Sequence, residues 1–372
     1  FARTHYYDEL GRPESVATSI AGEPFTSRLE YDGFSRVQIT HYPGGQDLAV
    51  RNVYNAYGHL GQVVDATTGE VHWHGVAANA DGNFTEEVLG GLTSVSVYDS
   101  GTGRIRAIDT GAGTVQNLEY VFDDLGNLIV RSDLRPGGGS EGFGYDNLNR
   151  LRTITTTVVG VSAVSGLDYD PLGNIVSKDG VGYDYDPARP HAVAGAGGIG
   201  YRYDANGNLE SDDRGRSLTW SYYNKPLRIA QGGTEIRFDY GPERARYRQA
   251  HTSAGTNRTT VYLGGLYERV QFPGITEHRH FIQAGGATVA VDIRRNNGQD
   301  ETRYLHRDHL GSVDTITDAQ GQILERNSYD AWGLRRLADW SDPLDLVTSI
   351  EPRGFTGHEH LDEVGLIHMN GR

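Results

Sequence analysis

The sequence predicts an almost all-β fold built from a repeated unit of two short strands, with very little helix. A tyrosine–aspartate pair recurs along the chain, in several places at steps of 23 or 24 residues, as from Tyr145 to Tyr169. Between the pairs, polar and apolar residues alternate with a period of two, and turn residues bound each run, which is typical of hairpins. The 50 Gly and 22 Tyr suit tight turns and half-exposed sheet faces. A fixed period of this length indicates a repeat architecture.

The Tyr-Asp pairs are the predicted structural positions of the repeat. Several continue as Asp-x-x-Gly, where the Asp can cap backbone N–H groups two or three residues along and the Gly can take a positive φ. The Tyr can lie over the neighbouring repeat. The repeat positions are Tyr7, Asp8, Tyr31, Asp32, Tyr98, Asp99, Tyr145, Asp146, Tyr169, Asp170, Tyr203, Asp204, Tyr329 and Asp330, and Tyr183-Asp184 has the same two letters.

The remaining elements follow from departures from this pattern. Tyr-Asp pairs disappear between residues 253 and 298, but the alternation persists, so strands are expected to continue there. A loop is expected at 137–139 and a flexible turn at 192–200, both rich in Gly. Only 86–89 and 334–340 are candidates for short helices. Residues 354–372 have a sequence pattern that differs from that of the repeats and are expected to form a terminal cap.

Composition excludes several classes of function. The net charge of −15 argues against nonspecific nucleic-acid binding, which requires a basic surface. The absence of Cys excludes disulfides, thiolate metal sites and cysteine nucleophiles. No apolar run approaches the roughly 18–20 residues that cross a bilayer.

The last 70 residues carry an ordered set of motifs. These are the run YLHRDHLGSV at 304–313, TDAQG at 317–321, YDAWG at 329–333, FTGHEHLD at 355–362 and GLIHMNGR at 365–372. Together they resemble the Rhs-associated core of the Rhs/YD-repeat proteins, and the Tyr-Asp repeats resemble the rest of that family. The resemblance divides the chain into repeats at 1–303 and a core block at 304–372, with the cap at 354–372. Its matched positions are His306, Asp308, His309, Gly311, Phe355, Gly357, Glu359, Gly365 and Arg372.

The resemblance implies a β-strip that spirals into a hollow shell, or an arc of one. In bacterial relatives such a shell encloses a C-terminal toxin, which is released by autoproteolysis at a DPxG-type tract. That tract and the toxin lie beyond the core block and are not in this chain, so we expect a structural segment with no catalytic residues and no cofactor. The expected partners are the toxin cargo, further N-terminal repeats or a companion shell protein, and a secretion-system spike or Tc-type component. Delivery to the outside of a bacterium is implied.

Other functional interpretations are weaker. His306-Arg307-Asp308 matches three letters of a kinase loop without the kinase context, and the glycines at 195–200 precede a strand instead of a nucleotide-binding helix. His358 and His360 could offer two imidazoles to a metal, but sequence places no third ligand. The many carboxylates recur with the repeat, unlike a hydrolase pair. An adhesin that uses the aromatic faces of Trp73, Trp220 and Tyr222 remains the main alternative.

The cap has a specific expected position. Strips leave exposed edges and open ends, which proteins usually cover. We therefore expect 354–372 to fold inward or across the opening of the shell. Its apolar contacts would come from Phe355, Leu361, Leu366, Ile367 and Met369.

Overall fold

The computed structural model describes residues 1–45, 47–253, 255–341 and 347–369. Most of this part of the chain is strand, and its helical elements are two 3₁₀ turns, η1 (Phe355–Gly357) and η2 (Asp362–Val364). The all-β prediction is confirmed. Within the described residues, no helix is long and apolar enough to cross a bilayer.

Three local predictions are wrong. Residues 86–89 lie in strand β8, because the Gly90-Gly91 turn folds this segment back on β9 in a hairpin. Residues 334–340 are not helical, and Arg335–Arg336 forms the short strand β33. Residues 192–200 form the end of β18, a two-glycine turn and the start of β19, so the segment is a hairpin and not an irregular turn.

Strands β1 to β31 form one antiparallel meander in which each strand pairs with the next along the chain. The outer part of the strip holds β1 (Ala2–Tyr7), β2 (Pro13–Ile20), β3 (Glu23–Tyr31), β4 (Val37–His41), β5 (Ala49–Tyr54), β6 (Leu60–Asp65), β7 (Val71–Ala78), β8 (Phe84–Leu89), β9 (Leu92–Tyr98), β10 (Ile105–Thr110), β11 (Gln116–Phe122) and β12 (Leu128–Asp133). The middle part holds β13 (Gly139–Tyr145), β14 (Leu151–Val158), β15 (Val161–Tyr169), β16 (Ile175–Lys178), β17 (Val181–Asp186), β18 (Arg189–Ala196), β19 (Ile199–Tyr203), β20 (Leu209–Asp212), β21 (Ser217–Trp220), β22 (Pro226–Gln231), β23 (Thr234–Tyr240) and β24 (Arg246–Ser253). The last part holds β25 (Thr256–Leu263), β26 (Tyr267–Phe272), β27 (Ile275–Ala284), β28 (Ala287–Arg295), β29 (Glu301–Arg307), β30 (Val313–Thr317) and β31 (Ile323–Arg326), and beyond the strip lie β32 (Ser328–Tyr329), β33, β34 (Glu359–Leu361) and β35 (Leu366–His368).

A β-bulge marks the end of the strand that leads into most Tyr-Asp turns. The pairing register shifts between Glu30 and Tyr31, between Gly144 and Tyr145, and between Asp168 and Tyr169. A bulge adds one residue to one strand, and it bends that strand and increases its twist. Because the bulges recur with the repeat, the bend accumulates along the strip.

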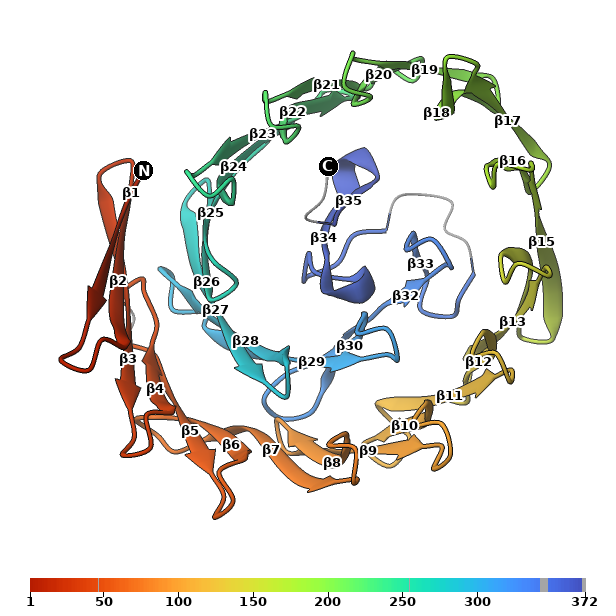
Figure 1. Cartoon of the computed structure of the whole chain (residues 1–372). Coiled ribbons are helices and arrows are strands. Elements are labelled where there is room, and N and C mark those ends of the chain that lie inside the picture. Colours follow the sequence, from red (N-terminus) through yellow and green to blue (C-terminus); the bar gives the residue numbers. More distant parts are fainter. Residues whose placement is uncertain (46, 254, 342–346, 370–372) are drawn as a thin grey trace.

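The strip rolls into a spiral of a little more than one turn (Figure 1). Strands β25–β30 lie inside the arc of β2–β9, so the wall is double there, whereas β13–β22 form a single-layered wall on the opposite side. We call β1–β12 the outer layer, β25–β31 the inner layer, and the interface between them the seam.

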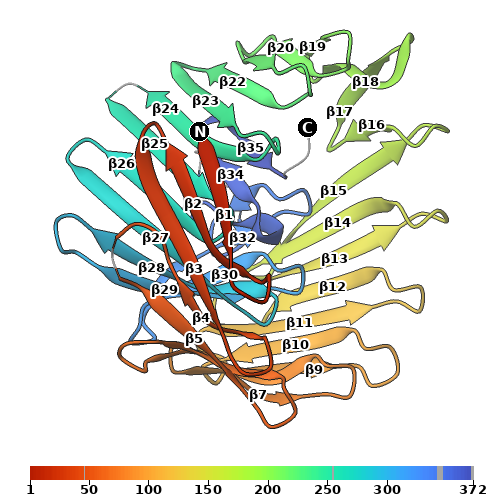
Figure 2. The same ribbon diagram turned by 60° about the vertical axis from the view of Figure 1, so that its left-hand side comes forward.

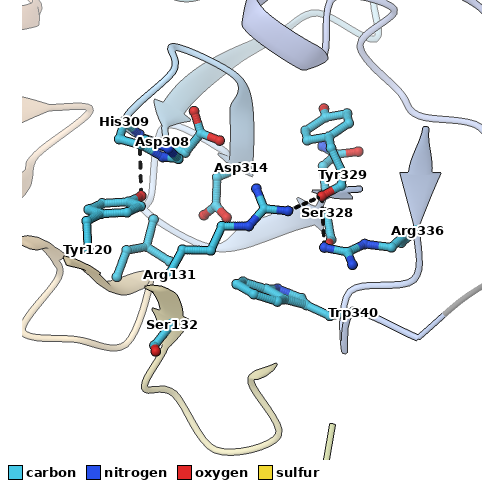
Figure 3. Close-up of a pocket in the computed structure, with 12 residues that line it drawn as sticks. Tyr120, Arg131, Ser132, Asp308, His309, Asp314, Ser328, Tyr329, Arg336 and Trp340 are labelled. Carbon is cyan, nitrogen blue, oxygen red and sulfur yellow. Dashed lines mark hydrogen bonds between the residues drawn. The ribbon is translucent and has the colours of Figure 1, made fainter. Parts of the chain in front are cut away.

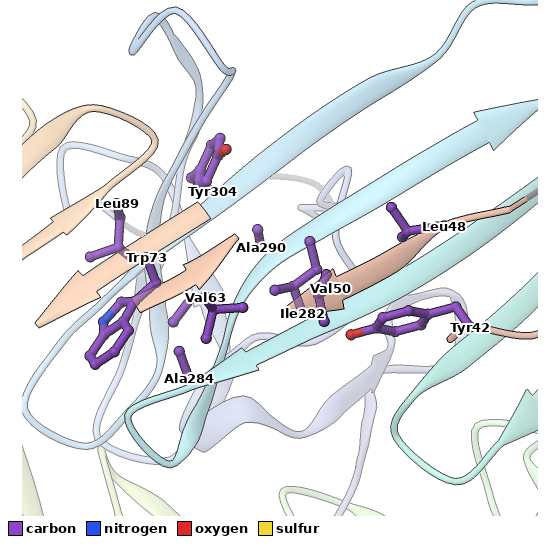
Figure 4. Close-up of a cluster of buried hydrophobic side chains, with 11 residues drawn as sticks. Tyr42, Leu48, Val50, Val63, Trp73, Leu89, Ile282, Ala284, Ala290 and Tyr304 are labelled. Carbon is purple, nitrogen blue, oxygen red and sulfur yellow. The ribbon is translucent and has the colours of Figure 1, made fainter. Parts of the chain in front are cut away.

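The main hydrophobic core fills the seam (Figure 4). From the outer layer, Val63 and Trp73 are fully buried, and from the inner layer Ile282, Ala290 and Tyr304 are fully buried against them. Fully burying a large apolar side chain stabilises a fold by about 1.5–3 kcal/mol. The seam therefore provides much of the energy that keeps the strip rolled.

Residues 347–369 follow a path inside the ring instead of continuing its wall (Figures 1 and 2). We call this stretch the inner segment. Leu361 and Val364 pack there against Leu218 and Ile236 of the wall. The segment thus joins a part of the strip more than a hundred residues earlier.

Candidate functional site: repeat turns, core block and inner segment

Each Tyr-Asp turn is held by its own aspartate. At Asp146, one carboxylate oxygen accepts the backbone N–H groups of Leu148 (2.9 Å) and Arg150 (3.0 Å), and the other accepts Nε of Arg150 (2.7 Å). The backbone N–H and the guanidinium of Arg150 hold the pKa of the Asp146 carboxyl below its usual value. Asp8, Asp32, Asp204 and Asp330 accept backbone N–H groups from the same relative positions.

The tyrosine of most pairs ties its repeat to the one before. The hydroxyl of Tyr169 donates to the backbone carbonyl of Leu151 at 2.7 Å, and that of Tyr145 donates to Leu128 at 2.8 Å. The acceptor is the first residue of a strand in the preceding repeat, and the same bond is made by Tyr31, Tyr54, Tyr240 and Tyr329, whereas Tyr203 donates to Val193 in the middle of β18.

The residue four places after the aspartate links its turn to the next repeat. Where it is Arg, it stacks on the next tyrosine ring, with the Arg150 guanidinium 4.4 Å from the centre of Tyr169. Arg12 on Tyr31 and Arg36 on Tyr54 repeat this geometry at 4.3 and 4.1 Å. Where it is Asn, its amide bridges the capping Asp to a residue in the following repeat, as at Asn127, Asn174 and Asn208.

Two details of the turn differ from expectation. The carboxylates of Asp170, Asp204 and Asp330 accept from the residue two along, as expected, and in addition from the residue four along. Asp99 has a longer turn and accepts from residues two and three along. The pair Tyr183-Asp184 lies within β17, and the turn geometry belongs to Tyr185 and Asp186.

Sequence reasoning overlooked several equivalent caps. Asn79, Asp212 and Asp318 each accept the same two backbone N–H groups without a preceding tyrosine. The signal that could have found them is an Asx residue three places before a Gly, which all three share.

The core block starts at the end of β29 and is built into the seam. His306 is buried, and its Nε2 lies 3.0 Å from Oγ1 of Thr317. Burial, with help from Arg326, lowers its pKa to about 4. Asp308 caps its turn and Gly311 supplies the positive φ of 79°.

His309 reaches across to the outer layer. Its ring lies 4.2 Å from that of Tyr120, whose hydroxyl accepts the His309 backbone N–H at 3.3 Å. Burial lowers the pKa of His309 to about 4. His306 and His309 thus act as packing groups at the seam.

A small cavity lies beside this contact (Figure 3). Its volume of about 30 Å³ suits a water molecule and no larger ligand. Asp314 lines it and is half-buried, with Gln116 of the outer layer and Thr315 donating to its carboxylate. Burial raises the pKa of Asp314 to about 6.

The inner segment is anchored by buried charge. Glu359 accepts hydrogen bonds from Arg246 and from the hydroxyl of Tyr262 (2.9 Å). Phe355 packs on the Tyr329 ring at 6.0 Å. Gly357 and Gly365 have positive φ of 73° and 61°.

The five apolar residues expected to hold the cap differ in burial. Leu361 is buried, Phe355, Leu366 and Ile367 are half-buried, and Met369 is 53% exposed. Arg372, the last matched position of the core block, lies outside the described residues.

The structure bears on the two alternative interpretations, a metal site at His358 and His360 and an adhesin surface of aromatic residues. His358 and His360 have protein partners, Thr356 for the first and the Phe355 N–H and Asp362 for the second. Within the described ranges, no group of three or more His, Cys, Asp or Glu side chains could hold a metal ion. Of the three aromatic residues proposed for an adhesin, Trp73 is fully buried, Trp220 is half-buried and only Tyr222 is exposed.

Solved structures share this architecture. The TcdB2-TccC3-TEV crystal structure aligns over 97% of the chain with a TM-score of 0.76 at 15% identity. TcdB2-TccC3 without its hypervariable C-terminal region aligns over 97% with a TM-score of 0.74 at 16% identity. The chain has the fold of the Tc toxin shell. It spans 21% of each of these Tc chains.

Two curated proteins similar to this chain are named as a toxin and as a nuclease. The double-stranded DNA deaminase toxin A of Burkholderia cenocepacia is 23% identical over 98% of the chain, and the tRNA3(Ser)-specific nuclease WapA of Bacillus spizizenii is 21% identical over 66%. The chain covers 28% and 10% of their lengths. No family model matches the chain.

Proposed function

We propose that this chain is a structural shell segment that houses and presents a C-terminal toxin domain. The observation that carries the proposal is the path of the inner segment, which enters the ring and ends its described part there at Met369. A domain attached downstream would start from the interior. The toxin names of the curated relatives and the Tc shell fold support the same function.

The chemistry of the side chains supports a structural role and not a catalytic one. The aspartates that recur in the repeats cap turns, as Asp146 does. The histidines of the core block, His306 and His309, pack in the seam with lowered pKa values. Autoproteolysis would belong to a tract outside this chain.

The core block at 304–372 functions, in this proposal, as the closing unit of the shell, with 354–372 as the plug. Glu359, Leu361 and Val364 fasten the plug to the wall. The plug would hold the start of the cargo away from the opening.

The partners follow from the free edges. Among the described residues, strand β1 pairs with β2 alone, and its side chains are mostly exposed, so we expect its other edge to pair with a strand of a preceding repeat or of a companion shell protein. A secretion-system spike or a Tc-type component would engage the assembled shell, which is delivered to the outside of a bacterium.

The cysteine-free chain allows a direct test. One variant carries a single cysteine appended after Arg372 and a matched variant carries one before Phe1. We expect a small maleimide to label both, whereas a maleimide on a long polyethylene glycol chain labels the C-terminal cysteine several-fold more slowly. Equal rates for both cysteines with the large reagent would contradict an interior exit.

A further inference from the structure

Three contacts between an imidazole and a tyrosine ring cross the seam. The ring centres are 5.6 Å apart for Tyr42 and His280, 6.4 Å for His72 and Tyr304, and 4.2 Å for Tyr120 and His309. In each pair, one residue belongs to the outer layer and the other to the inner layer. The two layers therefore meet repeatedly through histidine.

These imidazoles have no second hydrogen-bond partner among the described residues. His72 uses Nδ1 toward the Tyr304 hydroxyl at 3.3 Å, and its buried Nε2 has no partner. Nδ1 of His309 and Nε2 of His280 are also buried without a partner. A second proton on such a ring would create a charged N–H group with no acceptor, which is costly in a buried site.

The charges around His72 and His309 do not remove this cost. Glu70, Asp292 and Asp65 favour the charged form of His72 and Arg294 opposes it, yet burial outweighs them and lowers the pKa of His72. Around His309, Asp308 favours the charged form, Arg131 opposes it, and burial again dominates.

Three other ionisable side chains lie at the seam. Burial lowers the pKa of His306 to about 4, so acid acts on it in the same direction, but its hydrogen-bond partner Thr317 belongs to the same layer. His280 is 3.5 Å from the Asp292 carboxylate, which can pair with a charged ring, so it has no part in the inference. Asp314 works in the opposite direction, because acid removes its buried charge.

We propose that the seam is an acid-sensitive latch, in which protonation of His72 and His309 separates the inner layer from the outer layer while the hairpins stay paired. The hairpins are held by hydrogen bonds between backbone groups, which do not titrate, whereas hydrogen bonds across the seam involve a side chain, as between the Tyr42 hydroxyl and the Phe281 carbonyl and between the His309 N–H and the Tyr120 hydroxyl. The latch is independent of any cargo, because both of its residues contact only the strip itself.

The pH range follows from the sign of the pKa shifts. A histidine with a lowered pKa in the folded state stabilises that state above its usual value of about 6.5. This stability decreases as the pH falls and is lost near the folded value, about 4 for His309. Opening is thus expected between these limits.

The test compares three forms of the whole chain from pH 7.5 to 4. These are the natural sequence, the double variant His72→Gln with His309→Gln, and the control His59→Gln, which alters an exposed histidine. Small-angle scattering reports the radius of gyration, and hydrogen exchange reports which strands open. Gln keeps hydrogen-bonding capacity but cannot take a charge.

We expect the natural chain and the control to expand at the same pH, with exchange rising first in β6, β7 and β29. The double variant should expand at least about half a pH unit lower. Expansion of the double variant at the same pH as the natural chain would overturn the proposal, as would exchange that rises equally in the single-layered wall. If the double variant does not fold at pH 7.5, each single variant gives the same comparison.

Discussion

The guanidinium of Arg150 lies 4.4 Å from the centre of the Tyr169 ring, and the same guanidinium is bound to the carboxylate of Asp146. One side chain therefore joins the cap of one turn to the tyrosine of the next. The arrangement recurs at Arg12 and Arg36. Adjacent repeats are thus coupled through side chains as well as through the strand ladder.

Removing Arg150 and the Tyr169 ring separately and together should reveal this coupling. In a double-mutant cycle of Arg150→Ala and Tyr169→Leu, we expect an interaction free energy of about 0.5–1 kcal/mol, as for an exposed cation–π pair. Urea unfolding measures it. The exposed surface pair of Arg152 and Asp168 serves as the control, and an equal coupling there would refute a specific role for the stack.

The hydroxyl of Tyr169 should contribute by itself. Tyr169→Phe removes the bond to the Leu151 carbonyl, and we expect a loss of about 1 kcal/mol in the free energy of unfolding. Tyr222→Phe, at a ring that is 90% exposed, should have no measurable effect. Similar losses in both variants would contradict the link between repeats.

Gly90 tests the close approach of the two layers. A Cβ at this residue would lie 2.6 Å from the Tyr304 ring, whereas one at Gly91 would meet nothing within 4 Å, and both residues have positive φ. Gly90→Ala should therefore cost about 1–3 kcal/mol more than Gly91→Ala. Thermal unfolding of the pair measures this difference, which would vanish if backbone strain alone mattered.

Asp314→Asn should change the pH dependence of stability. The folded-state pKa of about 6 lies above the usual value, so the natural carboxylate costs stability above pH 6 and costs nothing below about pH 4. We expect the variant to be more stable by about 2–3 kcal/mol at pH 7.5, since Asn keeps an oxygen for Gln116, and equal to the natural chain at pH 4. An advantage that does not change with pH would contradict this account.

Glu359 should fasten the inner segment to the wall. Glu359→Ala leaves Arg246 buried without its partner, and the loss of a buried ion pair typically costs about 3–5 kcal/mol. Limited proteolysis should then cut within residues 347–369 much faster. The control Glu363→Ala alters a more exposed carboxylate of the same segment, 30% exposed, which pairs with Arg258 at 3.4 Å, and equally fast cleavage of that variant would argue against a specific anchoring role for Glu359.

The sequence predicted the all-β class and most of the capped turns, but not every local element and not the contacts between distant repeats. The turns at Asp146 and Gly173 could be predicted from the sequence, because Asp capping and the positive φ of Gly depend only on neighbouring residues. The residues next to Trp73 give no sign that its side chain is buried. Trp73 was expected on an exposed binding face, but it is fully buried in the seam. Its burial depends on where the spiral brings Ile282, and that depends on bends summed over some two hundred residues.

The meander has a consequence for how the molecule is made. Since every strand of the strip pairs with its chain neighbour, each hairpin can form as soon as its own residues leave the ribosome, without waiting for later sequence. The seam joins residues such as His72 and Tyr304, 232 positions apart, so it can close only when most of the strip exists. Rolling is therefore a late event in synthesis, and a sequence that follows the inner segment would be made only after the wall around it.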